Sequence, residues 1–432
     1  MQISIENALA GLKAGFIDAN PASQRQFEQQ TQTMPGGNSR SVLFYGPFPL
    51  TMARGRDAEL WDLDGHCYSD FIAEYTAGVY GHSAPEIRQA VLEAMDEGIN
   101  LTGHNLLEGR LAKLVCERFP QIEQLRFTNS GTEANLMAIT AALQFTGRRR
   151  IVVFSGAYHG GVLGFGAKPS ATTVPYDFLV LPYNDIERAQ AEIREHASDI
   201  AAVLVEPMLG AGGCIPAVPG FLAALRAATQ AAGALLIVDE VMVSRLGPQG
   251  LALPAGVKAD ITTLGKYIGG GMPFGAFGGR ADIMAMFDPR AGRLTHSGTF
   301  NNNVVTMAAG YAGLTRLFPP QAATALSARG ETLRQRLNAL CKAAAIEMQF
   351  TGVGSTMNAH FVSGPILRPD DFAQADARLR ELFFFHLLKS GIYTSPRGFI
   401  VLSLPVTDAA IEKLVAAVEA FIGAYRPLLV AA

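Results

Sequence analysis

The segment ALLIVDEV at residues 234–241 is an apolar run that ends in two carboxylates and a valine. Two similar runs precede it, IVVF at 151–154 and AVLV at 202–205, and sequence with helical periodicity separates each run from the next. Apolar strands joined by helices are typical of parallel βαβ units whose sheet is buried on both faces. We therefore predict an α/β fold with a doubly wound sheet. Asp239 is expected at its carboxyl edge, where such sheets bind ligands.

The chain of 432 residues is too long for one ordinary core, so we expect a large domain and a smaller one. Residues 1–75 have a helical beginning and short β-like pieces, as in an N-terminal arm that forms part of the small domain. Residues 76–312 alternate helix and strand and form the predicted large, ligand-binding domain. Residues 313–432, with predicted helices at 321–345 and 408–424, form the predicted α+β small domain.

The composition excludes several classes of function. Charged residues make up 17% of the chain and the net charge is -3, so no basic surface for nucleic acid is expected. No apolar run approaches the roughly 20 residues that span a bilayer, so we expect no membrane partner. The four cysteines are far apart and form no pair with metal-ligand spacing. The sequence therefore predicts no metal site and a cytoplasmic location.

Lys266 lies in LGKYIGGG, residues 264–271, beside a glycine-rich run. A surface lysine in a flexible loop is the usual interpretation of such a context. A lysine that bonds covalently to a carbonyl group, however, needs a partly desolvated ε-amine with little steric bulk around it, which glycines allow. Asp239 lies 27 residues earlier, about one αβ crossover away, so both side chains can reach one ligand. Unless it is only a helix cap, its carboxylate can keep a pyridine nitrogen protonated.

TNSGTEAN at residues 128–135 is a small-residue turn between a predicted strand and a predicted helix. Ser130, Gly131 and Thr132 place backbone N–H groups at the start of that helix. Such a helix start suits a phosphate group, and a plain N-cap without a ligand is an equal alternative.

Four more candidate residues lie in polar turns, three of them after predicted strands. Tyr158 and His159 follow the first apolar run, and the tyrosine ring either stacks on a planar ligand or packs in the core. Glu206 follows the second run, as a ligand contact or an ordinary strand-end carboxylate. Thr299, in SGTF at 297–300, is either another phosphate donor or a cap.

The motifs of these candidates, in this order and spacing, resemble those of the class III aminotransferases, which have pyridoxal 5′-phosphate (PLP) fold type I. They are SGTEAN at 130–135, AYHG at 157–160, EP at 206–207, DEV at 239–241, LGKYIGGGMPFGAFGGR at 264–280 and SGTF at 297–300. Three further segments resemble the branch that acts on aromatic β-amino acids such as β-phenylalanine. They are NSRSVLFY at 38–45, FIAEYTAGVYGHS at 71–83 and SPRGF at 395–399.

The resemblance implies a large domain with a mainly parallel seven-stranded sheet, a smaller α+β domain and PLP as cofactor. Lys266 would carry the cofactor covalently and move protons, and Asp239 would pair with the ring nitrogen. The other implied cofactor contacts are Val241 and Tyr158 on the two ring faces, Ser130, Gly131 and Thr132 on the phosphate, and His159 and Glu206 near the ring. Thr299 would reach the phosphate of a neighbouring subunit, which implies a homodimer with its sites at the interface.

The implied activity is transfer of an amino group from an aromatic β-amino acid to 2-oxoglutarate or another keto acid by a ping-pong mechanism. Arg40 and Arg397 suit the substrate carboxylates, because the arginine fork matches a carboxylate, although structural ion pairing is the alternative. Val42 and Tyr75, with Phe44 and Tyr80, are candidate walls of an aromatic-accepting pocket or core residues.

Three other functions are weighed against transamination. The glutamate-1-semialdehyde aminomutase branch shares the LGK-x-I-GGG form, but has a Thr-Gly-Phe-Arg-like stretch where this chain has Val243-Ser-Arg-Leu. A PLP-binding protein without turnover is disfavoured because Lys266, Asp239 and the 128–135 turn are all present. A dinucleotide-dependent dehydrogenase is disfavoured because no GxGxxG opens the first helix after a strand.

Overall fold

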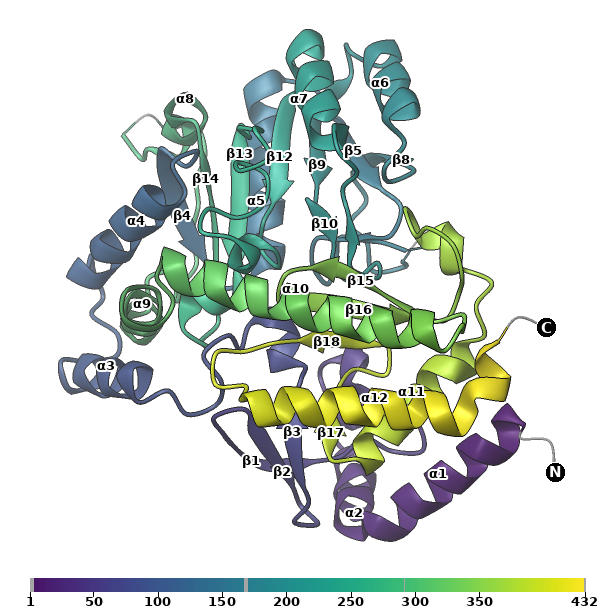
Figure 1. The fold of residues 1–432 in the computed structure, drawn as a ribbon. Helices are drawn as coiled ribbons and strands as arrows, with labels where there is room; N and C mark the ends of the chain where they lie inside the picture. Colours follow the sequence, from purple (N-terminus) through teal and green to yellow (C-terminus); the bar gives the residue numbers. More distant parts are fainter. Residues whose placement is uncertain (1–3, 167–169, 291, 431–432) are drawn as a thin grey trace.

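A computed structural model describes residues 4–166, 170–290 and 292–430 of the chain, and its centre is a seven-stranded sheet (Figure 1). The strands, in sheet order, are β4 (Gln124–Thr128), β14 (Gly275–Gly279), β13 (Ile261–Gly265), β12 (Leu235–Asp239), β9 (Ile200–Val205), β5 (Arg150–Phe154) and β8 (Asp177–Leu181). All neighbouring strands are parallel except those paired with β14, which runs antiparallel to both β13 and β4. The predicted mainly parallel α/β sheet is confirmed.

Helices pack against this sheet and against one another. They are α3 (Pro85–Asp96), α4 (Leu106–Arg118), α5 (Gly131–Thr146), α6 (Ile186–Glu195), α7 (Phe221–Ala232), α8 (Ala281–Met284) and α9 (Val304–Ala312). Helix α5 contacts β12, β13 and β14, and α7 contacts β9 and β12. Short pairs of strands, β6 (Ala157–Tyr158) with β7 (Gly164–Phe165) and β10 (Met208–Leu209) with β11 (Ile215–Pro216), lie beyond the ends of β5 and β9.

The sequence of α5 explains why it lies close to the sheet. Ser130 caps its N-terminus, where the hydroxyl accepts a hydrogen bond from the Glu133 N–H (3.2 Å), and Gly147 ends it in the left-handed conformation. Its buried face consists mainly of alanines, among them Ala134 and Ala138. Small side chains let a helix approach a sheet closely, so α5 sets where its own N-terminus meets the strand ends.

The two ends of the chain share the smaller sheets. Strands β1 (Met52–Arg56), β2 (Glu59–Asp62) and β3 (Cys67–Asp70) form one sheet with β17 (Ile392–Tyr393), which pairs parallel with β3. Strands β15 (Gln349–Val353), β16 (Thr356–His360) and β18 (Phe399–Val401) form an antiparallel sheet. The helices here are α1 (Ile5–Ala19), α2 (Pro21–Gln30), α10 (Pro320–Ala343), α11 (Ala377–Lys389) and α12 (Asp408–Leu429). The division of the chain at residues 75 and 312 stays a prediction.

Strand β14 is an element that the sequence did not predict. Its residues, GAFGG, have a poor strand composition, but the close packing of the sheet requires the glycines. A Cβ atom on Gly275 would lie 2.1 Å from the Ser130 carbonyl oxygen, and one on Gly279 would lie 2.0 Å from the Asp260 carbonyl oxygen. Strands β8, β13 and β15 were also not predicted.

Within the described residues, no helix has both the length and the apolar character that a membrane span requires. All four cysteines are free thiols. Glu192, Glu195 and His196 at the end of α6 lie close enough to share a metal ion. Glu192 already pairs there with Arg188 and His196 on the surface, so the cluster is explained by ordinary ion pairing.

Substitution of Gly275 by alanine should destabilise the fold, because the added methyl group meets backbone on the Ser130 side. We expect a loss of about 1–3 kcal/mol in the free energy of unfolding, measured by urea denaturation. Gly423→Ala is the control, since nothing lies within 4 Å of its Cβ position on α12. That variant should be neutral or slightly stabilised; equal midpoints for the two variants would contradict the packing argument.

Candidate active site

Most of the predicted cofactor-binding residues lie at the carboxyl edge of the large sheet. Asp239 ends β12, Glu206 directly follows β9, Lys266 directly follows β13, and the 158–161 and 129–132 turns follow β5 and β4. The hydrogen bonds described below join most of these segments directly. The edge-of-sheet prediction for Asp239 is confirmed.

Three donors hold the Asp239 carboxylate, which is 4% exposed. Oδ2 accepts hydrogen bonds from Asn135 Nδ2 and His159 Nδ1, both at 2.8 Å, and Oδ1 accepts one from the Val241 N–H at 2.9 Å. Asn135 is oriented in turn by Thr263 Oγ1, which donates to Asn135 Oδ1 at 2.8 Å. Helix α5, the turn after β5 and strand β13 therefore all fix the direction in which this carboxylate points.

Asn135 and Thr263 are site residues to which sequence reasoning gave no role. Asn135 is the last residue of the quoted motif SGTEAN, and Thr263 directly precedes the quoted motif LGKYIGGG. Only the packing of α5 on β13 brings the two side chains together. His159 Nε2 is buried and has no hydrogen-bond partner among the described residues, so it is free to bond to a ligand or water.

The 128–135 turn has the geometry of an anion cradle. Ser130 Oγ serves as the helix cap, so the N-cap alternative is correct for its side chain. The first N–H groups of a helix have no intrahelical partner and carry the positive end of the helix dipole, and here they belong to Gly131 and Thr132. A Cβ on Gly131 would lie 2.7 Å from Val241 Cγ1, so only glycine fits between this turn and Val241.

The turn after β5 packs on this cradle. The Gly161 N–H donates to Thr132 Oγ1 at 3.1 Å, and a Cβ on Gly160, whose φ is +134°, would lie 2.3 Å from the same hydroxyl oxygen. The adjacent Tyr158 ring is 52% exposed, which leaves it available to cover a planar ligand. It is not a core tyrosine.

Glu206 is buried beside these groups. Its carboxylate accepts hydrogen bonds from the Tyr158 and Gly210 N–H groups, both at 3.0 Å. Burial raises the pKa of Glu206 to about 7; His159 opposes this rise and Asp239 adds to it. The cluster therefore holds two carboxyl groups near one histidine, a charge arrangement that suits a ligand with a protonated nitrogen.

Lys266 is partly buried and adopts a left-handed φ of 55°. Its Nζ donates to the Tyr75 carbonyl oxygen at 2.5 Å. Burial lowers the pKa of Lys266 to about 8; the Arg40 charge adds to this, while Asp239 and Glu74 oppose it. The charges of Asp239 and of the predicted substrate arginine Arg40 are therefore close enough to influence the protonation of this amine.

From the sequence we expected the glycines near Lys266 to leave open space around it. They do not simply do so. A Cβ on Gly265 would lie 3.0 Å from Val241 Cγ1, and one on Gly269 would lie 2.3 Å from Phe274 Cβ. The glycines instead let neighbouring segments approach the lysine closely, and this packing supplies its burial.

Of the two predicted substrate arginines, Arg40 forms an ion pair with Glu74. Its guanidinium also lies 5.7 Å from the centre of the Tyr75 ring. Arg397 is exposed and has no salt bridge to any residue that the structure describes. Both arginines affect the pKa of the Tyr75 hydroxyl. Burial raises this pKa, whereas a hydrogen bond with the Ser395 hydroxyl and the positive charges of Arg397 and Arg40 oppose the rise. The two cations therefore flank one tyrosine near Lys266.

The candidate wall residues have different surroundings in the structure. Tyr75 Oη donates to the Val42 carbonyl oxygen at 3.2 Å, and its ring stacks on Phe399 with the centroids 6.0 Å apart. Tyr80 is 5% exposed and packs edge-on against Phe318, so the core interpretation is correct for it. Phe44 is 49% exposed.

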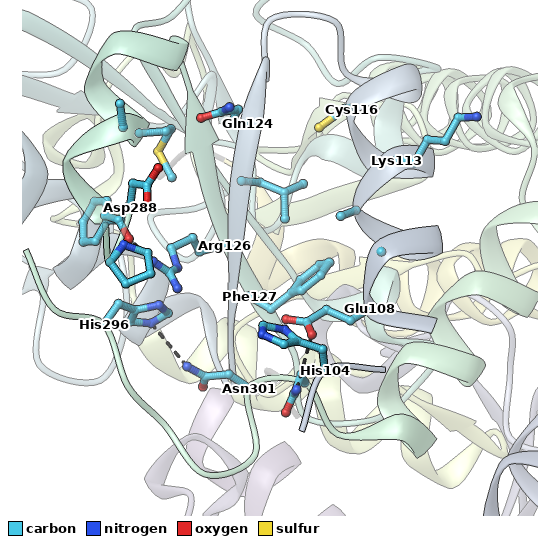
Figure 2. A pocket seen from close by; sticks show the side chains of 18 of the residues that line it. His104, Glu108, Lys113, Cys116, Gln124, Arg126, Phe127, Asp288, His296 and Asn301 are labelled. Carbon is cyan, nitrogen blue, oxygen red and sulfur yellow. Dashed lines mark hydrogen bonds between the residues drawn. The ribbon is translucent and has the colours of Figure 1, made fainter. Parts of the chain in front are cut away.

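Thr299 lies in an exposed turn, and no hydrogen bond or salt bridge joins it to the Lys266 and Asp239 cluster among the described residues. The turn does border the cradle, because Asn129 Nδ2 donates to Asn301 Oδ1 at 2.9 Å. An open groove of about 1120 Å³ begins beside it, between α4, β4 and the 281–289 segment. Figure 2 shows His296 and Asn301 on one side of this groove and His104 and Glu108 on another.

Comparison with known proteins identifies relatives of the whole chain. Residues 44–422 match the model of the family "Aminotransferase class-III". The chain is 71% identical over 426 residues to the beta-phenylalanine transaminase of Variovorax paradoxus, an alignment that covers 99% of this chain and 98% of that protein.

Solved structures agree with this result. The crystal structure of a beta-phenylalanine aminotransferase from Variovorax paradoxus superposes with a TM-score of 0.98 at 71% identity, covering 99% of this chain and 100% of that one. An omega-transaminase from Sphaerobacter thermophilus gives 0.88 at 37% identity, with 94% and 98% covered. A glutamate-1-semialdehyde-aminomutase from Pseudomonas aeruginosa gives 0.89 at 21% identity, with 97% and 98% covered, a likeness of fold alone.

Glu240, next to Asp239, provides a pH-dependent test of this buried region. Its Oε1 accepts hydrogen bonds from the Leu251 and Ala252 N–H groups at 2.9 Å, while Oε2 has no partner among the described residues. Burial raises the pKa of Glu240 from 4.5 to about 7, so the folded state binds its proton more tightly than the unfolded state does. Its contribution to stability is complete below pH 4.5 and is lost as the pH rises through 7.

Glu240→Gln should remove this pH dependence, because the neutral amide keeps an oxygen acceptor for both N–H groups. Between about pH 4.5 and 8, the free energy of unfolding of the parent protein should fall relative to the variant by on the order of 3 kcal/mol. Urea denaturation of both proteins across this range measures the difference. A constant difference would mean that Glu240 is ionised throughout.

Proposed function

The chain belongs to the class III aminotransferases, which are PLP-dependent enzymes of fold type I, and we propose that it takes the amino group from an aromatic β-amino acid such as β-phenylalanine. The acceptor is 2-oxoglutarate or another keto acid. The observation that carries this proposal is the 71% identity over nearly the whole chain to a transaminase with that donor in its name. The pair of arginines around Tyr75 supports it, since both substrates need cations for their carboxylates.

The residues of the site fit PLP. The cradle formed by Gly131 and Thr132, which a Cβ would fill, suits its phosphate, and the unpartnered His159 Nε2 offers one more polar contact. Asp239, oriented by its three donors, would hold a proton on the ring nitrogen. Val241 would contact one ring face and the exposed Tyr158 the other. When bound, the cofactor joins the substrate amine covalently and accepts the electrons of the neighbouring C–H bond.

Lys266 would move the protons of the reaction. Its ε-amine would hold the cofactor covalently and would be freed when the amino donor binds. Its free amine would take the proton from the substrate carbon that bears nitrogen and would later release that proton, acting first as base and then as acid. With a pKa of about 8, the free amine is partly unprotonated near neutral pH, as a general base must be.

The active unit would be a homodimer in the cytoplasm. Leu101, Leu106 and Phe300 are 50%, 78% and 57% exposed, and they lie within a few residues along the chain of His104, Asn105 and Asn301, which line the groove next to Thr299. Large exposed apolar side chains close together mark contact surfaces, and a second copy of the chain would cover them. Thr299 would then lie against the phosphate cradle of the partner.

Lys266→Ala should abolish transamination, by at least about a thousandfold, because the variant lacks both the covalent anchor and the proton carrier. Borohydride reduction followed by peptide mass spectrometry should attach the cofactor to Lys266 in the parent protein and to no peptide in the variant. Lys258→Ala is the control, since Lys258 is an exposed surface partner of Glu123. Reducible attachment in Lys266→Ala would refute the assignment.

Arg40→Ala and Arg397→Ala should impair the two half-reactions unequally. The donor has one carboxylate and an aryl group, whereas 2-oxoglutarate has two carboxylates, so each arginine serves the two substrates differently. We expect at least one loss of about tenfold or more in the rate of cofactor conversion, measured by stopped-flow absorbance with each substrate alone. Arg56→Ala, at an exposed arginine beside Asp57, is the control.

Equal losses for donor and acceptor in both arginine variants would contradict these roles. Failure of every β-amino acid to convert the cofactor of the parent protein would refute the substrate class, while the family assignment would stand.

A further inference from the structure

The turn Ala73–Thr76 has an unusual backbone that the proposed function does not explain. Its four residues all lie in the left-handed region, with φ values of 44°, 49°, 52° and 79°, and none is glycine. Residues with a side chain rarely adopt this backbone conformation because it is strained, so the surroundings must hold the turn in place. Strain concentrated in one segment in this way is typical of functional sites.

The turn supplies two contacts of the active site. The Tyr75 carbonyl oxygen accepts the hydrogen bond from Lys266 Nζ at 2.5 Å, and Glu74 forms the ion pair with Arg40. A shift of this backbone would move the acceptor of the lysine and the partner of the arginine together.

A buried arginine lies behind this turn. Arg245 is 0% exposed and has no carboxylate partner within the described part of the chain. Its Nη1 donates to the Thr76 carbonyl oxygen at 3.2 Å, and its Nη2 donates to the Leu402 carbonyl oxygen. Burial lowers the pKa of Arg245 to about 10, so it stays charged near neutral pH. Burying a guanidinium without a counter-charge is unfavourable, and a purely apolar side chain at this position would avoid that penalty.

The two carbonyl groups that Arg245 bridges belong to segments already in contact. The Val401 N–H donates to the Phe71 carbonyl oxygen at 2.7 Å, so the end of β18 runs beside the residues just before the turn. The guanidinium closes the other end of this contact. Its fork is what allows one side chain to hold both carbonyls, whereas a lysine ammonium is a compact point charge on a flexible stem.

We propose that Arg245 is a positioning residue of the active site: it pins the Ala73–Thr76 turn, and thereby places the Tyr75 carbonyl against Lys266 and Glu74 against Arg40. This inference rests on the roles proposed above for Lys266 and Arg40. The charged groups around the lysine amine are then Arg40, Glu74, Asp239 and Arg245, and the turn fixes Glu74 directly. When Lys266 is not bonded to the cofactor, its amine is held by the Tyr75 carbonyl oxygen.

Arg245→Lys tests the fork while keeping the charge, and Arg245→Gln tests it without a buried charge. Arg118→Lys is the matched control, because Arg118 is 7% exposed and likewise donates to two backbone carbonyls, those of Pro248 and Phe318, but none in the turn. All three variants lose a buried guanidinium, so a general loss of stability affects each of them.

Hydrogen–deuterium exchange of the holoenzyme measures the turn without any substrate. The Ala77 and Gly78 N–H groups donate to the Glu74 and Ala73 carbonyls at 3.2 and 2.8 Å, and they report whether the turn is closed. In the parent protein these amides should be protected. Both Arg245 variants should exchange them about tenfold faster or more, while the control leaves them within about twofold of the parent.

The half-reaction with the amino donor is the second measurement. Its rate at saturating donor should fall about tenfold in both Arg245 variants and stay within about threefold of the parent in Arg118→Lys, because only the former lose the placement of Lys266. Rapid exchange of the Ala77 and Gly78 amides in the parent protein, or equal exchange in the Arg245 and Arg118 variants, would overturn the proposal. An error in the donor assignment leaves the exchange result unaffected.

Discussion

The Asp239 carboxylate is the point at which three separate parts of the chain are held together. Asn135 comes from α5, His159 from the turn after β5, and the Val241 N–H from the residues just beyond β12. Because each donor needs both correct distance and correct direction, the three bonds fix the helix and the turn relative to the strand. The carboxylate that we propose as the partner of the cofactor's ring nitrogen is thus positioned by the same contacts that order the sheet edge.

The rest of the site follows from how closely α5 approaches the sheet. Its N-terminus can serve as an anion cradle only if the turn before it fits against Val241 and strand β14, and glycines at positions 131 and 275 make this possible. At these two positions, in α5 and in β14, the chain has no side chain that could pack. The Gly131 backbone can therefore lie close to Gly265, the residue before Lys266.

The lysine side of the site depends on burial and strain. Burial shifts the pKa values of four ionisable groups in the direction that favours their neutral forms. These groups are Lys266, Glu206, Glu240 and Arg245. The left-handed turn at Ala73–Thr76 adds backbone strain next to them. Such groups reduce stability, and a fold of this size with two large apolar cores can sustain them.

The sequence by itself determined the parallel apolar strands, the place of Asp239 at the end of one of them, and the helix cap at Ser130, because these depend on local pattern and on residues adjacent in the chain. It also carried the family resemblance. Only the tertiary structure decided four other features. They are strand β14, the hydrogen bond between Thr263 and Asn135, the ion pair of Arg40 with Glu74, and the hydrogen bond of Arg245 with the Thr76 carbonyl. The side-chain contacts join residues 34 to 169 positions apart, and β14 is a glycine-rich segment with little strand propensity of its own. No local preference encodes such contacts; they exist because the packed fold brings polar groups that are distant in sequence within hydrogen-bond distance of one another.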